Sequence, residues 1–299
     1  MSTVTAVARR EPHPDERPWL ASGTVVLTIA QLSDIHCGSL YFDPGLLNHA
    51  VEEVLALQPD MVVVAGDLTQ EGYANEFQMA RDALRPLLDE LLTVVVPGNH
   101  DAKNVGYVHF EDHFGKGDAG NDVVVDLARG VTPERVTLVA VDSSKPDLAE
   151  GEVGRFRYPW IREQFATPSD FRIFALHHHL VPVPGTGRER NTVWDAGDVL
   201  AVLEESGVDL VLCGHKHVPH IWVVDGIMVV NSGTVSSFRL RGYARPSYNV
   251  VTIDPEAISV TLMYPGSGEK LAARYDRTTR VLDRNPELAG MFSKSTWGW

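Results

Sequence analysis

Short apolar runs rich in β-branched residues recur along the first hundred residues, and each run ends at a polar side chain. This pattern predicts strands over 24–33, 61–66 and 91–97. The run 61–66 is apolar throughout, which is typical of a strand covered by helices on both faces. We therefore expect parallel strands joined by helices, in βαβαβ order.

Helical periodicity fills the two segments between these strands. Asp43 and Pro44 are suited to an N-cap and a first-turn proline. One face of the helix that follows carries apolar side chains, namely Leu47, Val51, Val54 and Leu55. The second expected helix has its apolar positions near helical spacing, at Phe77, Ala80, Leu84, Leu87, Leu88 and Leu91. We expect Pro86 to kink or end this second helix.

The rest of the chain alternates between strand and helix patterns less regularly. Helices are expected over 156–166 and 195–206, the second stopped by Gly207. Roughly the last 35 residues, which close on Trp297-Gly298-Trp299, are expected to be irregular. A hairpin is expected over 221–231. Further strands are expected over 123–127, 135–142, 171–176, 208–214, 248–253 and 257–264.

The domain organisation follows from where these patterns begin and end. Residues 1–22 carry charges and prolines without apolar periodicity, which predicts a flexible arm. Residues 23–265 are expected to form one domain, and residues 266–299 a C-terminal extension. The N-terminus lacks the order of a signal peptide. The uncharged run over 18–33 is too interrupted to span a membrane, so we expect a cytoplasmic protein.

Composition and charge narrow the class of protein. The apolar set makes up 44% of the 299 residues, as in an ordinary globular protein. With 26 Lys and Arg against 40 Asp and Glu, the formal net charge is −14. This charge argues against a broad surface for duplex nucleic acid, although a bound cation can reverse the field locally. The sequence leaves a monomer and a homo-oligomer open.

Polar side chains that bind metal ions follow five of the expected strands. Loops at the carboxyl ends of strands in an α/β sheet line one crevice, so these side chains are expected to meet. Imidazole with carboxylate suits Mn, Fe or Zn, and seven such ligands are more than one ion needs. We therefore expect two divalent metal ions. The candidates at these strand ends are Asp34, His36, Asp67, Asn99, His100, Asp101, His177, His215 and His217.

The order of these motifs resembles that of the calcineurin-like metallophosphoesterases, and especially the bacterial branch that includes class III cyclic-nucleotide phosphodiesterases. The resemblance covers about residues 24–264. It implies an α/β fold, a four-layer α/β/β/α sandwich of two mixed β-sheets flanked by helices. The motifs are Asp34-x-His36, Gly66-Asp67, Gly98-Asn99-His100-Asp101, a histidine at 177 and Gly214-His215-x-His217.

The same resemblance implies a role for each of these side chains. One ion would be held by Asp34, His36, Asp67 and His217. The other would be held by Asp67, Asn99, His177 and His215, with Asp67 bridging. His100 would lie beside the substrate phosphate, and Asp101 would orient His100. Purple acid phosphatases add a tyrosine three residues after the bridging aspartate, where this chain has Gln70, so no tyrosinate-bound ferric site is expected.

The chemistry expected of such a site is attack of a metal-bridging hydroxide on phosphorus, with His100 stabilising the transition state. We expect a phosphodiesterase for small phosphate esters such as cyclic nucleotides. A phosphomonoesterase or a nucleotide pyrophosphatase is the alternative, and a nuclease is disfavoured by the acidic charge. A catalytically silent metal-binding scaffold is the rival from another class.

Several residues near these motifs have ordinary explanations. His178 is the alternative to His177 as a ligand. Cys37 and Cys213 flank candidate ligands, but we expect buried thiols there, with Cys213 turned away from the site. Three arginines are expected on a solvated loop rather than on a distal substrate phosphate; they are Arg239, Arg241 and Arg245. The histidines without a matching motif are His49, His109, His113 and His220.

Overall fold

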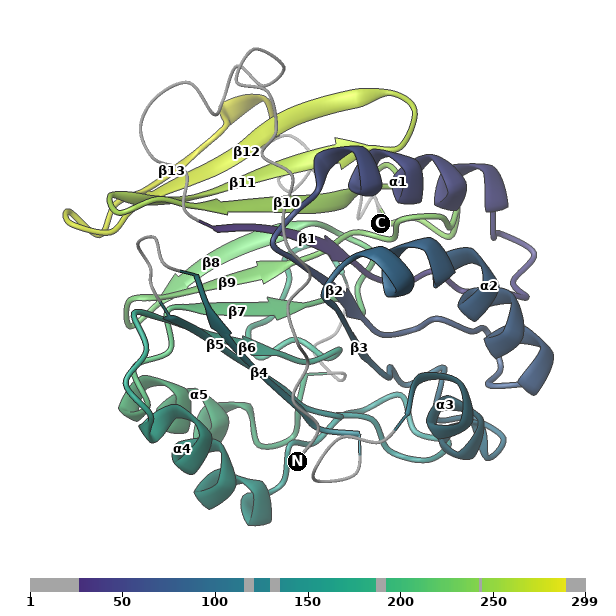
Figure 1. The fold of residues 1–299 in the computed structure, drawn as a ribbon, viewed down its shortest axis with the longest axis horizontal. Helices are drawn as coiled ribbons and strands as arrows, with labels where there is room; N and C mark the ends of the chain where they lie inside the picture. The colour runs from purple at the N-terminus through teal and green to yellow at the C-terminus, as the bar shows by residue number, and fades with distance from the viewer. Residues whose placement is uncertain (1–26, 116–120, 130–134, 187–191, 242–243, 289–299) are drawn as a thin grey trace, which may run out of the picture.

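Two mixed β-sheets lie face to face, with helices on their outer sides (Figure 1). The computed structural model describes residues 27–115, 121–129, 135–186, 192–241 and 244–288. The arm expected over 1–22 and the tail at 297–299 lie outside these residues. The expected four-layer sandwich is confirmed.

The first sheet has the strand order β13-β12-β11-β10-β1-β2-β3. Strands β1, β2 and β3 pair in parallel, as the βαβαβ pattern predicted, whereas β1 meets β10 in antiparallel register. The remaining neighbours, from β10 to β13, are also antiparallel. The strands are β1 (Leu27–Leu32), β2 (Met61–Ala65), β3 (Thr93–Val96), β10 (Tyr248–Ile253), β11 (Ala257–Tyr264), β12 (Gly268–Asp276) and β13 (Leu282–Arg284).

The second sheet has the order β4-β5-β6-β7-β9-β8. Its four central strands are parallel, and an antiparallel strand closes each edge. Strands β8 and β9 are joined at Asp225 and Gly226, where the hairpin was expected. The strands are β4 (Val123–Ala128), β5 (Arg135–Ala140), β6 (Phe171–Ala175), β7 (Leu210–Cys213), β8 (His220–Val224) and β9 (Ile227–Asn231).

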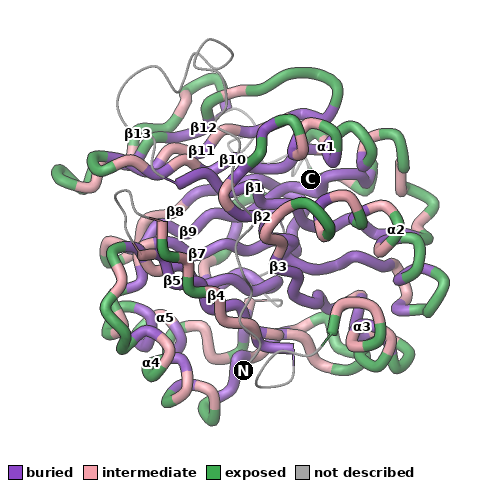
Figure 2. The backbone as a smooth tube through the Cα atoms, viewed as in Figure 1, coloured by how far each residue is buried: buried purple, intermediate pink, exposed green. Residues whose placement is uncertain are grey.

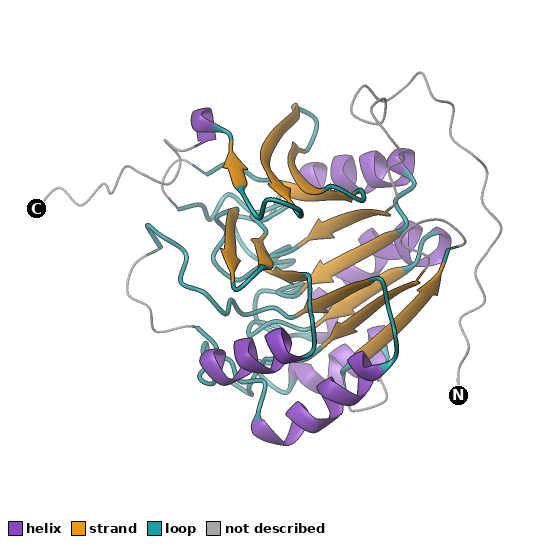
Figure 3. Cartoon of the chain, turned by 90° about the vertical axis from the view of Figure 1, so that its left-hand side faces the viewer, coloured by secondary structure: helices purple, strands orange, loops and turns teal. Residues whose placement is uncertain are grey.

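Five α-helices of the described residues cover the outer faces of the sheets (Figures 1 and 3). Side chains of α1 and α2 pack on the first sheet, and side chains of α4 and α5 pack on the second. A third apolar core fills the space between the two sheets. The helices are α1 (Pro44–Leu57), α2 (Ala74–Glu90), α3 (Gly106–Phe114), α4 (Tyr158–Ala166) and α5 (Ala196–Glu205).

Three local features differ from the sequence predictions or decide between alternatives. The expectation of an irregular end is wrong, because β12 and β13 extend the first sheet. Helix α3 was not predicted; it buries Phe110 although the residue before the helix offers no side-chain cap. Pro86 lies inside α2, which continues to Glu90. Asp43 caps α1 as expected, accepting hydrogen bonds from two backbone N–H groups of the first turn.

Candidate metal centre

The loops that follow five parallel strands converge on one buried cluster of side chains. These loops follow β1, β2 and β3 in the first sheet and β6 and β7 in the second. Potential ligand atoms within 4.8 Å of one another fall into three groups of three residues. The groups are Asp34, His36 and His217; His36, Asp67 and His100; and Asp67, His177 and His215.

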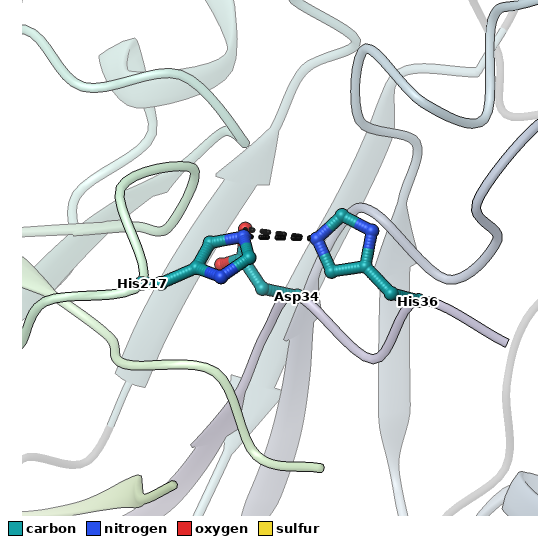
Figure 4. A group of neighbouring side chains, drawn as sticks. All are labelled: Asp34, His36 and His217. Carbon is teal, nitrogen blue, oxygen red and sulfur yellow. Dashed lines mark hydrogen bonds and ion pairs between the residues drawn. The ribbon is translucent and has the colours of Figure 1, made fainter. Parts of the chain in front are cut away.

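The first group brings the two sheets together through Asp34, His36 and His217 (Figure 4). The Nε2 atoms of His36 and His217 lie 2.9 Å apart. Asp34 Oδ1 lies 3.3 Å from His217 Nε2 and 3.9 Å from His36 Nε2. Three ligand atoms thus point at one another although their residues are up to 183 positions apart, and all three residues are buried.

A second set of ligand atoms lies around Asn99. Asn99 Oδ1 is 2.9 Å from His215 Nδ1 and 3.2 Å from His177 Nε2, and these two ring nitrogens are 3.2 Å apart. Asp67 Oδ2 is 3.3 Å from His177 Nε2 and 3.7 Å from His36 Nε2. A single carboxylate oxygen of Asp67 therefore faces both sets of ligand atoms.

Hydrogen bonds at the other polar atom orient His177, His217 and both aspartates. His177 Nδ1 donates to the Ala65 carbonyl at 2.7 Å. His217 Nδ1 likewise donates to the Arg239 carbonyl at 2.7 Å. Such bonds fix the tautomer that leaves Nε2 free for a cation. The second oxygen of each aspartate is also occupied, since Asp34 Oδ2 accepts from Ser33 Oγ and Asp67 Oδ1 from the His100 backbone N–H.

Five of the residues in the cluster have left-handed backbone conformations. Positive φ is uncommon for residues other than glycine, and such strain concentrates at functional sites. The pattern in the sequence did not reveal this feature, because the tertiary contacts of each loop set its backbone angles. The five residues are Asp34 (φ 55°), His36 (58°), Asp67 (54°), His215 (75°) and His217 (58°).

Two glycines allow these loops to approach closely. A Cβ atom at Gly98 would collide with the Asp67 carboxylate, and one at Gly214 would collide with Ser33 Oγ. A glycine before Asn99 and another before His215 are therefore needed to bring the loops after β3 and β7 against the aspartates.

Burial and mutual charge set the protonation of these side chains. Burial lowers the pKa of His36 to about 3, so its ring is neutral. Burial opposes ionisation of Asp67, yet the nearby His177 and His100 hold its pKa well below the usual range. Burial would also lower the pKa of His177, but the Asp67 carboxylate raises it to about 9, so this ring holds a proton that a cation would displace. Imidazoles beside ionised carboxylates are the donor set of first-row divalent metals, so these residues fit such ions.

The structure distinguishes between His177 and His178. Both ring nitrogens of His178 lie near groups outside the cluster, with Nδ1 at 2.9 Å from Ser143 Oγ and Nε2 at 3.3 Å from the Ala149 carbonyl. His177 alone of the two directs a nitrogen at the cluster. The neighbouring His179 is buried and stacks on His215, with ring centroids 5.6 Å apart.

His100 lies at the edge of the cluster and is partly exposed. Its Nδ1 is 2.6 Å from the Gln70 carbonyl, and its ring meets that of His36 edge-on at 4.7 Å. Asp101, expected to orient this residue, accepts hydrogen bonds from the backbone of Leu68, Thr69 and Gly98. Its carboxylate therefore binds the loops after β2 and β3. Sequence reasoning missed the Gln70 carbonyl, which no side-chain pattern can reveal.

A cavity of about 380 Å³ opens over the cluster. Arg239 and Arg241 are exposed, as expected of a solvated loop, and both also line this cavity, whereas Arg245 stacks over Tyr264. The lining residues are Asp67, Asn99, His100, Ala149, His215, His217, Arg239, Leu240 and Arg241.

The remaining candidates lie away from the cluster. Burial raises the pKa of the Cys37 thiol to about 12 and raises that of Cys213 as well, so both cysteines are neutral. Cys213 packs in the apolar core beside α4 and α5, as expected. The other histidines are placed on the surface or against aromatic rings; they are His49, His109, His113 and His220.

Comparison with known proteins finds bacterial phosphodiesterases among the relatives of this chain. The chain is 29% identical over 201 residues to a probable cyclic nucleotide phosphodiesterase of Rhodococcus erythropolis, covering 63% of this chain and 64% of that protein. It is 27% identical over 227 residues to a cAMP/cGMP dual specificity phosphodiesterase of Mycobacterium tuberculosis, covering 71% of this chain and 69% of the other. The chain thus spans about two thirds of the length of these relatives.

A solved structure and a family model extend the comparison. The purple acid phosphatase from yellow lupin superposes with a TM-score of 0.65 at 15% identity, covering 84% of this chain and 52% of that one, so the two share a fold. No helix of the described residues is long and apolar enough to cross a membrane. Residues 27–219 match the family model for calcineurin-like phosphoesterases. The chain therefore belongs to the calcineurin-like phosphoesterase family of metal-dependent hydrolases.

Proposed function

We propose that this chain is a dinuclear metal-dependent phosphodiesterase that acts on small phosphate esters. The observation that carries the proposal is the position of Asp67 Oδ2, which faces His36 Nε2 on one side and His177 Nε2 on the other. One carboxylate shared between two sets of ligands is an economical way to hold two cations close together. The names of the bacterial relatives support cleavage of a diester.

The ligands divide into two sets. Asp34, His36 and His217 hold one ion together with Asp67. Asn99, His177 and His215 hold the other together with the same aspartate. Mn, Fe and Zn all suit this mixture of imidazole and oxygen donors.

When bound, two divalent cations would neutralise the charge of the phosphate oxygens and would lower the pKa of a water molecule so that it ionises near neutral pH. The chain itself supplies the surroundings. His100 lines the cavity and donates through Nδ1 to the Gln70 carbonyl. In its imidazolium form the ring also carries a hydrogen on Nε2, which can be donated to a phosphate oxygen or to the leaving oxygen. Asp101 holds the loop after β2 in place through backbone N–H groups, and is a positioning residue.

Metal analysis and a matched pair of substrates test this proposal. The protein is purified with Mn²⁺, its metal content is measured by mass spectrometry, and hydrolysis of bis-p-nitrophenyl phosphate is compared with that of p-nitrophenyl phosphate. We expect two ions per chain and faster turnover of the diester. A single ion per chain would contradict the dinuclear assignment. Preference for the monoester would contradict the diesterase assignment, and no turnover of either would contradict the enzyme.

A further inference from the structure

Two arginines share the cavity with the proposed metal ligands. Arg239 and Arg241 lie in the segment between β9 and β10, and both line the cavity beside His100 and His217. The sequence around them contains no phosphate-binding motif, and the proposed hydrolysis of a simple diester does not use them.

Hydrogen bonds hold both arginines at this position. The Arg239 carbonyl accepts from His217 Nδ1 at 2.7 Å, so the backbone carrying this arginine is tied to a proposed ligand. The Arg239 backbone N–H donates to Ser237 Oγ at 3.2 Å. Arg241 Nη1 donates to the Thr186 carbonyl at 3.2 Å, which anchors one corner of its guanidinium.

The positive charges of these arginines are not matched by carboxylates within the described residues. Arg155, Arg157 and Arg162 all pair with an aspartate or glutamate, as expected in a chain of net charge −14. Among the described residues, neither Arg239 nor Arg241 forms such a pair. Burial and the charge of Arg239 lower the pKa of Arg241, and the Asp34 carboxylate offsets only part of this effect. The two arginines therefore lie close enough to repel each other.

The carboxylates nearest to the cavity are already matched by other groups. Asp67 and Asp34 face the histidines and the proposed cations, and Asp67 is the single carboxylate among the residues that line the cavity. The two guanidinium groups therefore add a positive charge of 2 at the rim of this cavity, which favours an anionic ligand there.

We propose that Arg239 and Arg241 bind a terminal phosphate group of a substrate whose phosphodiester lies at the metal centre. This inference rests on the proposed function and deepens it by naming the substrate class, a phosphodiester that carries a second, dianionic phosphomonoester. A phosphomonoester has a charge of about −1.5 to −2 at neutral pH and three acceptor oxygens, which two planar guanidinium groups match in charge and shape. The cavity volume of about 380 Å³ lies within the range of small-molecule sites.

A matched pair of chromogenic substrates tests this inference. Thymidine 5′-(p-nitrophenyl phosphate) and its 3′-phosphorylated form have the same leaving group and differ only in the second phosphate. With the Mn²⁺-loaded protein we expect kcat/KM to be about tenfold or more higher for the 3′-phosphorylated substrate, because charge-assisted hydrogen bonds of this kind are worth roughly that factor. The preference should shrink as salt is added.

Variants then assign the preference to the two arginines. In Arg239→Gln and Arg241→Gln the ratio of kcat/KM between the two substrates should fall towards one, since glutamine removes the charge and the guanidinium but leaves the backbone contacts in place. Arg245→Gln is the matched control, because Arg245 lies over Tyr264, and it should keep the wild-type ratio. Both substrates report on the same folded molecules, so partial misfolding cancels from the ratio.

Calorimetric binding of thymidine 3′,5′-bisphosphate and thymidine 5′-phosphate gives a readout that does not depend on turnover. We expect the bisphosphate to bind about tenfold more tightly, and Arg241→Gln to remove that difference. Equal binding of the two nucleotides, or a preference that survives both arginine variants, would overturn the inference alone. Tight bisphosphate binding without hydrolysis of either ester would instead overturn the proposed function.

Discussion

The parallel and antiparallel parts of the first sheet differ in how deeply their strands are buried and in whether candidate ligands follow them. Every residue of β1 and β2 is buried, because the second sheet covers one face and helices cover the other. Strand β12 mixes exposed and buried residues (Figure 2). These two strands, β1 and β2, are mostly apolar along their length, and the charged residues Asp34 and Asp67 lie just after their ends. The antiparallel strands lengthen the sheet and the core between the sheets.

The first way to test this contrast is to remove the shared carboxylate. Asp67→Ala should lower hydrolysis of bis-p-nitrophenyl phosphate by about a thousandfold or more, because both sets of ligands lose a member. The metal content per chain should fall as well. The matched control is Asp254→Ala in the antiparallel part, where Asp254 Oδ1 accepts two backbone N–H groups in the turn after β10. Full activity of Asp67→Ala would refute the assignment of the centre.

Removal of the metal should lower the thermal stability of the protein. A ligand that binds only the native state at a thousand times its dissociation constant adds about 4 kcal/mol to the free energy of unfolding. For a chain of this size that corresponds to a Tm shift of roughly 6 °C. Differential scanning fluorimetry with and without EDTA measures the shift. Asp67→Ala should show little response to EDTA, and an equal response in both proteins would count against binding at this cluster.

A substitution in the antiparallel part should change stability and leave the chemistry alone. Ile258 in β11 is buried in the core between the sheets and lies opposite Ile253 and Tyr275. Ile258→Ala should lower the free energy of unfolding by about 2–4 kcal/mol through lost burial and a cavity. Chemical denaturation measures that loss. The kcat/KM and metal content of the folded fraction should match wild type, and a large change in either would show that the two parts are coupled.

A smaller effect is expected within the loops of the parallel part. Asp101 accepts backbone hydrogen bonds at both carboxylate oxygens, from Thr69 at Oδ1 and from Leu68 and Gly98 at Oδ2. Asp101→Asn must turn an NH₂ group towards backbone N–H donors in either amide orientation. We expect a loss of about 1–3 kcal/mol in stability and a fall in kcat, measured by denaturation and by diester hydrolysis. Unchanged stability would show that these bonds contribute little.

The same contrast explains what could be predicted from the sequence. Asp34, Asp67 and Asn99 were predictable because each ends a stretch of residues apolar enough to identify a doubly covered strand. Strands β12 and β13 could not be predicted, because strands near the end of a sheet with one face open to solvent need few apolar residues. The left-handed backbone at the ligands depends on contacts between loops from different strands, and no local pattern encodes it.

Neighbouring histidines show the same limit on a finer scale. His177 and His178 differ in which way each ring points after β6, and that depends on how the loop leaves the strand. The resemblance to the family favoured His177, but the residues alone left both open. The sequence likewise could not show that Arg239 and Arg241 reach the cavity, because the segment that carries them is placed by its bond to His217.

The smallest effect is expected on the exposed side of the antiparallel part. Leu271 in β12 is 50% exposed and lies opposite Thr261. Leu271→Thr should change the free energy of unfolding by at most about 0.5 kcal/mol, because threonine suits a strand and little apolar area is lost from the interior. In β2, Val64 is fully buried, so Val64→Thr should cost about 1–3 kcal/mol by burying a hydroxyl group. If denaturation gave equal losses for both, the outer side of β12 would be covered in solution, and the contrast between the two parts of the sheet would rest on topology alone.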